Sequence, residues 1–574
     1  MQKSVDLVFL WHMHQPDYRD YSSGDFMLPW TYLHAIKDYT DMAYHLEQHP
    51  KVHAVVNFVP ILLDQLEDYA NQFATGQLRD PLLRMLAHDN ACGELSPEQR
   101  KFILEACFRT NHTKMIAPYP VYKRLLELFE RLQVDGEIAL SYLSDQYMAD
   151  LLTWYHLVWC GESVRREHDL VVNLMSKAEG YSLEDRQQLL ALIGKLINGI
   201  IPRYRKLSES GQIEISSTPH YHPLAPLLID FNSAREAMPE APLPMSIRYP
   251  AGKIRVAAHI AKAKQSHTAR FGRAPEGMWP AEGSISDSTL SVMAEEGCRW
   301  VASGESVLIN SLRKSKHDVP DRAQYLYRPY RLEKGGDGLQ CFFRDDHLSD
   351  LIGFEYSRWH GKDAARHFIE QIETIANRAP DGEKPIVSVI LDGENAWEYY
   401  PYNGHYFLDE LYTMLESSTC IRTTTYSEYI SPSTAQQQEP ARARTHNLPG
   451  VVAGSWVYGT FSTWIGSPDK NRAWDLLCAA KHSFDMVISS GRLSQAEQDA
   501  AEKQLCSCES SDWFWWFGDY NPSHSVASFD RLFRHNLTEL YRLLKLPRPT
   551  NLSEPVSQGG GSPEAGGAMR RGSE

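Results

Sequence analysis

Residues 385–395 read PIVSVILDGEN, an apolar run that ends directly in the carboxylates Asp392 and Glu394. Helical patterns separate most such runs, and strands that alternate with helices indicate a parallel sheet covered on both faces. Seven runs are many for a small open sheet, so a closed barrel of strands and helices is the natural alternative. The other six runs are VDLVFLWHMH (5–14), VHAVVNFVP (52–60), GQIEISSTPHYH (211–222), PEGMWPAE (275–282), RWVASGE (299–305) and LQCFFRDDH (339–347). In nearly all of them the polar residues fall at the C-terminal end, where barrel enzymes carry their chemistry.

The patterns divide the chain into a barrel, a helical insertion and a C-terminal domain. We assign residues 1–430 to the barrel and about 61–201 to the insertion, where SPEQRKFILEACF (96–108) has the signature of a helix start. A stretch rich in Pro and Gln (431–444) is typical of a connection. Residues 445–548 then form the C-terminal helical domain. Residues 549–574 have little apolar content and are expected to be a disordered tail.

Composition narrows the classes of partner. The net charge of −15 disfavours binding to nucleic acid or anionic lipid, which relies on clustered Lys and Arg. The chain shows no secretory signal and no apolar stretch of membrane-spanning length. Nine scattered cysteines favour reduced thiols. We therefore expect a cytoplasmic protein that acts on a neutral or small ligand.

Three carboxylates are candidates for a catalytic pair. Asp392 and Glu394 would share one face of a strand, and like charges held close raise one pKa. Taken alone, DGEN is equally well read as a surface turn. Glu282 follows another apolar run beside Trp279, although an isolated Glu in such a place is more often solvated or salt-bridged. Because cleavage of a glycosidic bond needs two carboxylates that flank it, Glu282 and Asp392 are the natural pair.

A histidine motif leaves two interpretations open. HMHQP (12–16) contains His12 and His14, and HYHP (220–223) contains His222. Two histidines at the end of a first barrel strand can begin a zinc site, for which Asp345, Asp346 and His347 would supply further ligands. The same side chains can instead donate hydrogen bonds to sugar hydroxyls. Burial in the core remains the alternative for one member of each pair.

Aromatic residues crowd the polar ends of the runs and the C-terminal part. Trp397 follows DGEN, and Trp464 lies further along the chain. Flat rings with polar edges suit the apolar faces of sugars, although most tryptophans pack in cores. No phosphate-binding glycine loop or serine nucleophile elbow stands out, so nucleotide-dependent chemistry and serine hydrolysis have no support.

Taken together, the motifs resemble glycoside hydrolase family 57 from about residue 6 to residue 546. The resemblance rests on five regions in order: HMHQP (12–16), GQIEISSTPHYHP (211–223), GMWPAEGS (277–284), LDGENAWE (391–398) and FSTWIGSPDKNRAW (461–474). It implies a (β/α)7 barrel, a helical C-terminal domain that closes over the cleft, no metal or other cofactor, and retention of configuration. Glu282 matches the family's nucleophile and Asp392 its general acid/base.

The resemblance implies a retaining enzyme that acts on α-1,4-glucans such as starch, glycogen or maltodextrins. Transfer between glucan chains or branching at the same site remains open, because motifs separate these activities poorly. Two further alternatives are a zinc-dependent hydrolase and a carbohydrate-binding protein without catalysis. The expected substrate-binding residues are His12, His14, Glu214, His222, Trp279, Asp346, Glu394, Trp397 and Trp464.

Overall fold

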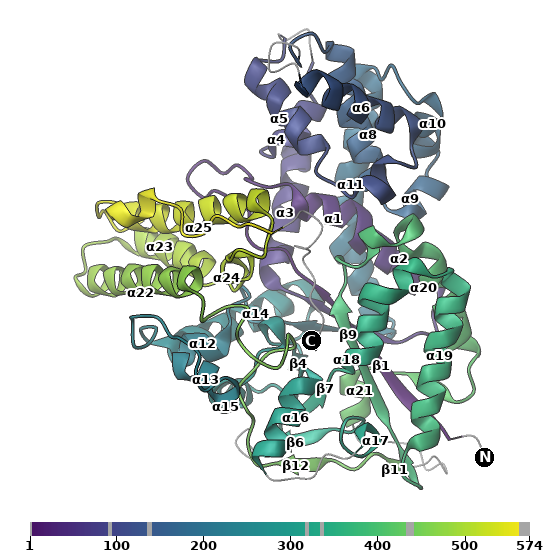
Figure 1. Ribbon diagram of the computed structural model, residues 1–574, viewed down its shortest axis with the longest axis vertical. Helices are drawn as coiled ribbons and strands as arrows, with labels where there is room; N and C mark the ends of the chain where they lie inside the picture. The colour runs from purple at the N-terminus through teal and green to yellow at the C-terminus, as the bar shows by residue number, and fades with distance from the viewer. Residues whose placement is uncertain are drawn as a thin grey trace.

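The computed structural model describes residues 3–89, 94–134, 140–315, 321–332, 338–431 and 441–561. Most of the predicted connection, and residues 562–574 of the predicted tail, lie outside these ranges. Figure 1 shows a barrel region with a group of helices above it and a second group of helices on one side. No helix in the described ranges combines the length and the apolar character that crossing a membrane requires.

Each of the seven apolar runs contains a strand. The strands are β1 (Val5–Met13), β2 (Ala54–Phe58), β3 (Ile213–Ser217), β4 (Gly277–Met278), β5 (Trp300–Ser303), β7 (Gln340–Phe343) and β9 (Ile386–Asp392). They pair in parallel in the order β9-β1-β2-β3-β4-β5-β7. A parallel bridge between Arg344 and Ser388 then joins the end of β7 to β9. The described residues thus close a ring of seven parallel strands, which confirms the barrel.

The register brings candidate residues into one layer. His12, near the end of β1, pairs with Asn57 on β2 and with Asp392 on β9. Both neighbours of His12 are therefore fixed by backbone hydrogen bonds rather than by loop conformation. This layer lies at the C-terminal ends of the strands, where barrel enzymes place their active sites.

Short strands extend the sheet outside the ring. β10 (Ile421–Thr423) pairs with the first residues of β1, and β6 (Tyr330–Leu332) runs antiparallel to β7. β12 (His446–Leu448) pairs with β6, so the first residues of the range that we assigned to the C-terminal domain belong to the barrel sheet. A separate pair consists of β8 (Glu383–Lys384) and β11 (Ala441–Arg442).

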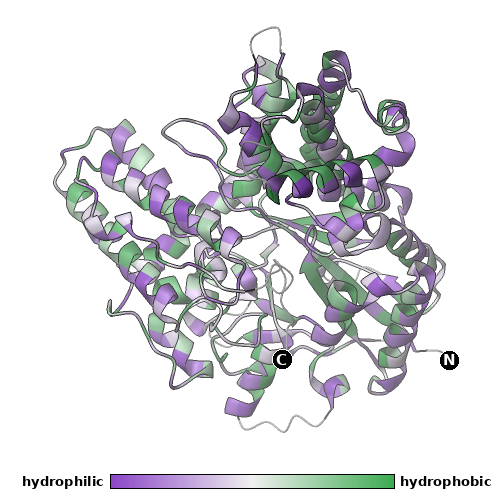
Figure 2. Ribbon diagram, turned by 45° about the horizontal axis from the view of Figure 1, so that its top comes forward, coloured by the Kyte–Doolittle hydropathy of each residue, from purple (hydrophilic) through white to green (hydrophobic). Residues whose placement is uncertain are grey.

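A helical insertion lies between β2 and β3. After α1 (Trp30–His34), η1 (Ala35–Tyr39) and α2 (Thr40–Gln48), which connect β1 to β2, the insertion contains α3 (Pro60–Thr75), α4 (Pro81–Leu86), α5 (Pro97–Cys107), η3 (His112–Ile116), α6 (Pro120–Val134), α8 (Asp145–Trp159), α9 (Glu162–Glu167), α10 (Asp169–Lys177) and α11 (Leu183–Glu209). The predicted helix start at Ser96 is confirmed, with reciprocal hydrogen bonds between Ser96 and Gln99. These helices form the upper group in Figure 1, and Figure 2 shows apolar residues along their inward faces.

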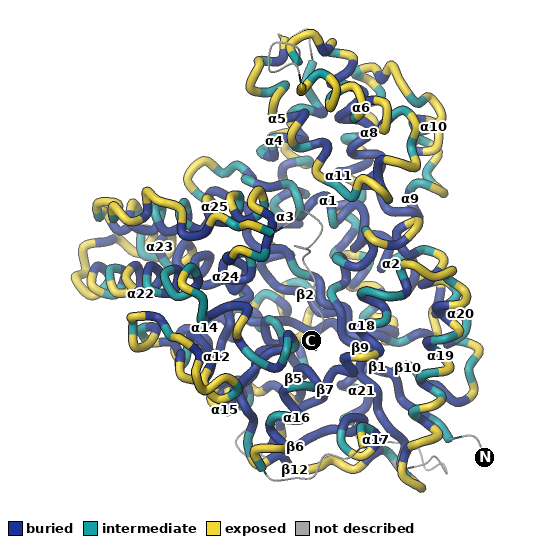
Figure 3. Tube along the Cα trace, viewed as in Figure 1, coloured by how far each residue is buried: buried dark blue, intermediate teal, exposed yellow. Residues whose placement is uncertain are grey.

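Most of the remaining barrel helices cover the strands from outside, whereas α21 (Tyr426–Ile430) packs Tyr426 and Tyr429 against a separate apolar cluster of strand residues that includes Trp300. The remaining helices are α12 (Ala225–Ile229), η4 (Phe231–Ser233), α13 (Ala234–Ala237), α14 (Gly252–Phe271), α15 (Asp287–Glu295), α16 (Glu305–Lys314), α17 (Arg322–Tyr325), α18 (Asp346–Asp350), η7 (Leu351–Glu355), η8 (Tyr356–Arg358), α19 (Gly361–Arg378), α20 (His405–Ser417) and α21. Figure 3 shows that the strands are buried, whereas exposed residues lie on the outer sides of the helices.

The C-terminal domain is helical. It contains α22 (Pro468–Ser489), α23 (Gln495–Cys508), α24 (Asp512–Trp516) and α25 (Ser523–Leu543). The apolar residues that recur along 526–544 at helical spacing are all buried: Val526, Phe529, Phe533, Leu537, Leu540 and Leu544. Residues at this spacing lie on one face of a helix, and this face of α25 packs inward.

Residues 549–561 differ from the disordered tail that we expected. They contain η11 (Thr550–Ser553), and Leu552 and Val556 are buried. The backbone N–H of Val556 donates to Asp530 on α25 at 2.6 Å. The stretch is polar in composition, which is why we expected disorder. Its two apolar residues, Leu552 and Val556, are nevertheless buried against neighbouring elements.

Candidate active site

A cleft of about 980 Å³ opens at the C-terminal ends of the strands. All three parts of the chain line it: the barrel, residues 108–113 of the insertion, and a C-terminal segment that includes Trp515 and Trp516. Of the residues that we predicted for the site, the cleft is lined by His12, His14, His222, Glu282, Asp392 and Glu394.

Glu282 lies in a tight turn after β4. The turn is η5 (Ala281–Gly283), and both Glu282 (φ 59°) and Gly283 (φ 58°) adopt left-handed backbone conformations. Replacing Gly283 by a larger residue would be destabilising, because an added Cβ would lie 2.6 Å from a ring carbon of Trp279. The indole of Trp456 donates to Oε2 of Glu282 at 3.1 Å. The turn therefore holds the carboxylate at the cleft in a conformation that a residue with a side chain rarely adopts.

Asp392 is the last residue of β9. The side-chain amide of Asn395 donates to its Oδ2 at 2.9 Å. Burial raises the pKa of Asp392 to about 6, against the opposing effects of Asn395, His14 and Arg344. A carboxyl group with a pKa near the working pH can both give and take a proton.

Burial also raises the pKa of Glu282 well above its usual value, and the charge of Asp392 raises it further. The charge of Asp392 therefore acts on Glu282, as expected for two carboxyl groups that share one cleft.

Glu394 supports the loop after β1. Its Oε1 accepts from the backbone N–H of His14 at 3.0 Å and from the side chain of Gln15 at 3.3 Å. Burial, followed by the charge of Asp392, raises the pKa of Glu394 well above its usual value. Glu394 is 2% exposed, so it contributes to the cleft wall mainly by holding the HMHQP segment against β9.

The histidines form a hydrogen-bonded chain. Nδ1 of His12 lies 2.7 Å from Oδ1 of Asn57, whose amide group donates to Ser216. Nε2 of His12 lies 3.2 Å from Nε2 of His222, and Nδ1 of His222 lies 2.9 Å from the Ser511 hydroxyl. Burial, and then neighbouring histidines, lower the pKa of His12 to about 3 and that of His222 well below its usual value. Both rings are thus neutral, and a continuous set of hydrogen-bond contacts joins Ser511, His222, His12 and Asn57.

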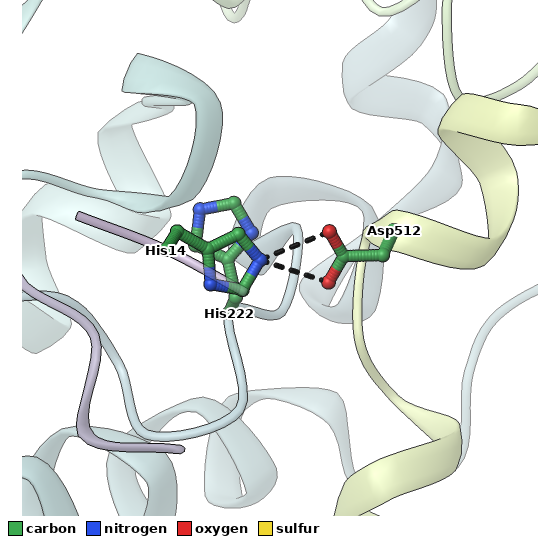
Figure 4. A group of neighbouring side chains, drawn as sticks. All are labelled: His14, His222 and Asp512. Carbon is green, nitrogen blue, oxygen red and sulfur yellow. Dashed lines mark hydrogen bonds and ion pairs between the residues drawn. The ribbon is translucent and has the colours of Figure 1, made fainter. Parts of the chain in front are cut away.

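His14 links the barrel to the C-terminal domain. Its ring stacks on that of His222 with the centroids 3.8 Å apart, and its Nε2 lies 2.9 and 3.0 Å from the two carboxylate oxygens of Asp512. Figure 4 shows the two rings overlapping, with Asp512 reaching them from α24. Asp512 and Ser511 were missed as site residues, although SDWFWWFGD (511–519) is a conspicuous run of polar and aromatic residues.

The zinc alternative does not have the ligands that we expected. Asp345 is held by Arg322 and Asp346 by Arg344, each at 2.8 Å, so neither joins the histidines. The described residues that could hold a metal at the cleft are His14, His222 and Asp512, whose ligand atoms lie within 4.8 Å of one another. Their facing atoms are already used in hydrogen bonds to one another, to His12 and to Ser511.

Five predicted substrate-binding residues lie behind the cleft wall. They are Glu214, Trp279, Asp346, Trp397 and Trp464, and none of them lines the cleft. Glu214 lies near the start of β3, so its side chain is away from the strand end that meets the cleft. It accepts instead from the Trp300 indole at 2.7 Å. Trp279 and Trp464 are fully buried, and Trp397 donates to the carbonyl of Gly393 at 2.9 Å.

Four of these five residues support elements near the site without facing it, whereas Glu214 lies towards the other end of the barrel. Trp279 packs beneath the Glu282 turn, and Trp397 supports the DGEN turn. Trp464 packs on Trp515, which does line the cleft. Asp346 binds Arg344, and burial raises its pKa to about 7.

A parallel barrel with two partly buried carboxylates in a cleft at the ends of its strands is the architecture of a glycosidase-type enzyme. The sequence profile of glycosyl hydrolase family 57 matches residues 8–444, and the chain belongs to that family.

Solved structures support the fold over nearly the whole chain. The chain is 16% identical to a GH57 branching enzyme from Thermococcus kodakaraensis, with a TM-score of 0.54 over 95% of this chain and 90% of that chain. An α-amylase from Thermotoga maritima gives 14% identity and a TM-score of 0.55 over 95% and 93%. A GH57-type branching enzyme from Pyrococcus horikoshii is 15% identical, with a TM-score of 0.52 over 100% of this chain and 99% of that chain. Likeness at these identities shows the fold, and no curated protein sequence matches the chain.

Proposed function

We propose that the protein cleaves α-1,4-glucans with retention of configuration, with Glu282 as nucleophile and Asp392 as general acid/base. The observation that carries this proposal is that Glu282 and Asp392 line the same cleft, each at the C-terminal end of a barrel strand. Retaining glycosidases place two carboxyl groups close together, and a charge on Asp392 that raises the pKa of Glu282 is what such closeness produces.

The reaction proceeds in two displacements. In the first, a Glu282 oxygen forms a bond to the anomeric carbon while the glycosidic bond breaks, and the Asp392 proton passes to the leaving oxygen. In the second, the Asp392 carboxylate takes a proton from water or from a sugar hydroxyl, whose oxygen then displaces Glu282 from the anomeric carbon. The two inversions together retain the configuration.

Three observations support a glucan as substrate. The family profile covers the barrel and its two carboxylates, and the similar solved structures are named as branching enzymes and an amylase. The cleft is large enough for several sugar units, with three parts of the chain around it. The presence of both carboxylates weighs against a binding protein without catalysis.

The products from maltoheptaose test this proposal. Hydrolysis gives shorter sugars only, whereas transfer gives longer chains as well, and new α-1,6 linkages would indicate branching. Chromatography of the products with size standards separates these outcomes. The Glu282→Gln variant, which keeps the shape of the side chain, is the matched control and should form no product. If the native protein leaves maltoheptaose and amylose unchanged, the substrate assignment is wrong.

A further inference from the structure

Exposed aromatic residues gather on one surface beside the cleft. Tyr402 is 58% exposed, Tyr406 49% and Trp359 43%. Trp359 is the one exposed tryptophan in the described ranges, which contain all fourteen. Gly361, two residues after Trp359, lies directly against Tyr406, because an added Cβ would be 3.2 Å from Cβ of Tyr406. Large aromatic side chains that stay exposed together often mark a binding surface.

The backbone that presents Tyr402 is held in a rare conformation. Tyr402 (φ 53°), Asn403 (φ 53°) and Gly404 (φ 72°) are three consecutive left-handed residues, and two of them are not glycine. Asn403 is buried, and its side-chain amide donates to Asp41 at 2.8 Å. Such conformations persist where the surrounding structure fixes them, and they are concentrated at functional sites. The exposed position of Tyr402 is therefore built into the fold.

Arg166 of the insertion holds the two tyrosines in place. Its guanidinium lies 5.7 Å from the ring centroid of Tyr402 and 4.9 Å from that of Tyr406, and it donates to the Tyr406 hydroxyl at 3.0 Å. The buried carboxylate of Glu162 accepts from Nε of Arg166 at 2.6 Å, which fixes the guanidinium. The two rings stand at 89° with their centroids 5.5 Å apart. Because both are braced, a ligand would bind without first ordering them.

This aromatic surface continues from the cleft. Tyr399, three residues before Tyr402, is 37% exposed and lines the cleft. The η9 turn (Trp397–Tyr399) that carries Tyr399 packs against η3 of the insertion, and residues of η3 also line the cleft. The η9 turn also packs against η10 (Pro401–Gly404), which carries Tyr402, so the exposed tyrosines follow directly on the edge of the cleft at Tyr399.

We propose that Tyr402 and Tyr406, braced by Arg166, form a second binding site for an α-glucan chain outside the catalytic cleft. The ring faces take the apolar faces of glucose units, and the Arg166 guanidinium and tyrosine hydroxyls bind sugar hydroxyls. Two rings at a right angle suit the curved chain that α-1,4 linkages produce. The choice of ligand rests on the proposed function.

The test is affinity electrophoresis in gels that contain glycogen. The double variant Tyr402→Ala, Tyr406→Ala should bind glycogen about tenfold more weakly, a loss that corresponds to about 1.4 kcal/mol. Its turnover of maltoheptaose should be unchanged, which also shows that it is folded. The matched control is Tyr142→Ala, which removes a tyrosine that is 84% exposed elsewhere on the insertion. Tyr406→Ala alone, in the first turn of α20, is a second variant that helix propensity favours.

Three outcomes would overturn the second site. The first is equal retention of the native protein and both tyrosine variants. The second is a native protein that turns over maltoheptaose but is not retained by glycogen. The third is a double tyrosine variant that is retained by glycogen like the native protein but differs from it in oligomeric state, as measured by light scattering. The tyrosines would then be a contact between copies of the chain. A native protein that neither binds glycogen nor acts on maltoheptaose would overturn the proposed function, and this inference with it.

Discussion

Trp456 donates two hydrogen bonds to Glu282. Its indole N–H donates to Oε2 of the carboxylate, and its backbone N–H donates to the carbonyl oxygen of the same residue, both at 3.1 Å. Trp456 lies in the segment that leads from the barrel to the C-terminal domain, 174 positions away in sequence. The orientation of the carboxylate at the cleft therefore depends on a residue that no local motif around Glu282 contains.

The Trp456→Phe variant should lower kcat and shift the pH profile. The indole hydrogen bond stabilises the ionised form of Glu282, and a bond to a charged group is worth about 1.5 to 3 kcal/mol. Its loss raises a pKa that burial already raises. The acidic limb of kcat/KM should consequently move to higher pH, since protonated Glu282 is inactive. An unshifted limb would mean that Trp456 acts only by packing.

Asp392→Asn and Glu394→Gln should fail differently. Asp392→Asn removes the proton donor, so it should nearly abolish activity on glucans but retain more on an aryl glycoside whose leaving group needs no proton. A glutamine at position 394 can still accept from the backbone N–H of His14 and from the side chain of Gln15. Glu394→Gln should therefore lose less activity on glucans. The reverse pattern, with leaving-group rescue in Glu394→Gln, would exchange the two roles.

The fold could be predicted from the sequence because each strand is a local feature. An apolar run between helical patterns identifies a strand by itself, and β9 with its DGEN turn shows this plainly. The candidate site could be predicted only in part, because a motif does not tell how deep a residue lies. Glu214 and Asp392 both belong to barrel strands, yet only Asp392 is at the end that meets the cleft. Ser511, Asp512 and Trp456 reach the site from distant segments, and the motifs around Glu282 and Asp392 do not indicate these partners.

The Glu509→Gln variant should reduce both stability and turnover. Glu509 is fully buried and accepts from Arg255, Tyr249 and His259 of the barrel at 2.6 to 2.8 Å. Removing one partner of a buried ion pair costs about 3 to 5 kcal/mol in the free energy of unfolding. Two residues later, the backbone N–H of Ser511 donates to the carbonyl of His222 at 2.9 Å. Weakening the hydrogen bonds of Glu509 to the barrel should therefore also displace Ser511 and lower kcat.

Asp475→Asn is the matched control for this experiment. Asp475 of α22 also joins the C-terminal domain to the barrel, by accepting from the backbone N–H groups of Met245 and Ser246. It does not line the cleft. Thermal unfolding and kcat, measured at a temperature where all variants are folded, separate the two effects. If the Glu509→Gln variant keeps the kcat of the native protein, Glu509 only stabilises the fold and does not position Ser511 for turnover.

Activity should survive exhaustive chelation. The hydrogen bonds of His12, His14 and His222 account for their positions without an ion, so treatment with EDTA and dialysis should leave the rate on maltoheptaose unchanged. Loss of the rate, followed by recovery on addition of zinc, would instead make His14, His222 and Asp512 metal ligands. Metal analysis of the dialysed protein is the necessary control.

The central claim is that Glu282 forms a covalent bond to the sugar. A fluorinated glucosyl donor that slows the second displacement should trap this intermediate, and mass spectrometry of a protease digest locates it. We predict one sugar per chain, on the peptide that contains Glu282, and no labelling of the Glu282→Gln variant. A label on Asp392 or Glu394, or a product of inverted configuration with no covalent adduct, would contradict the account.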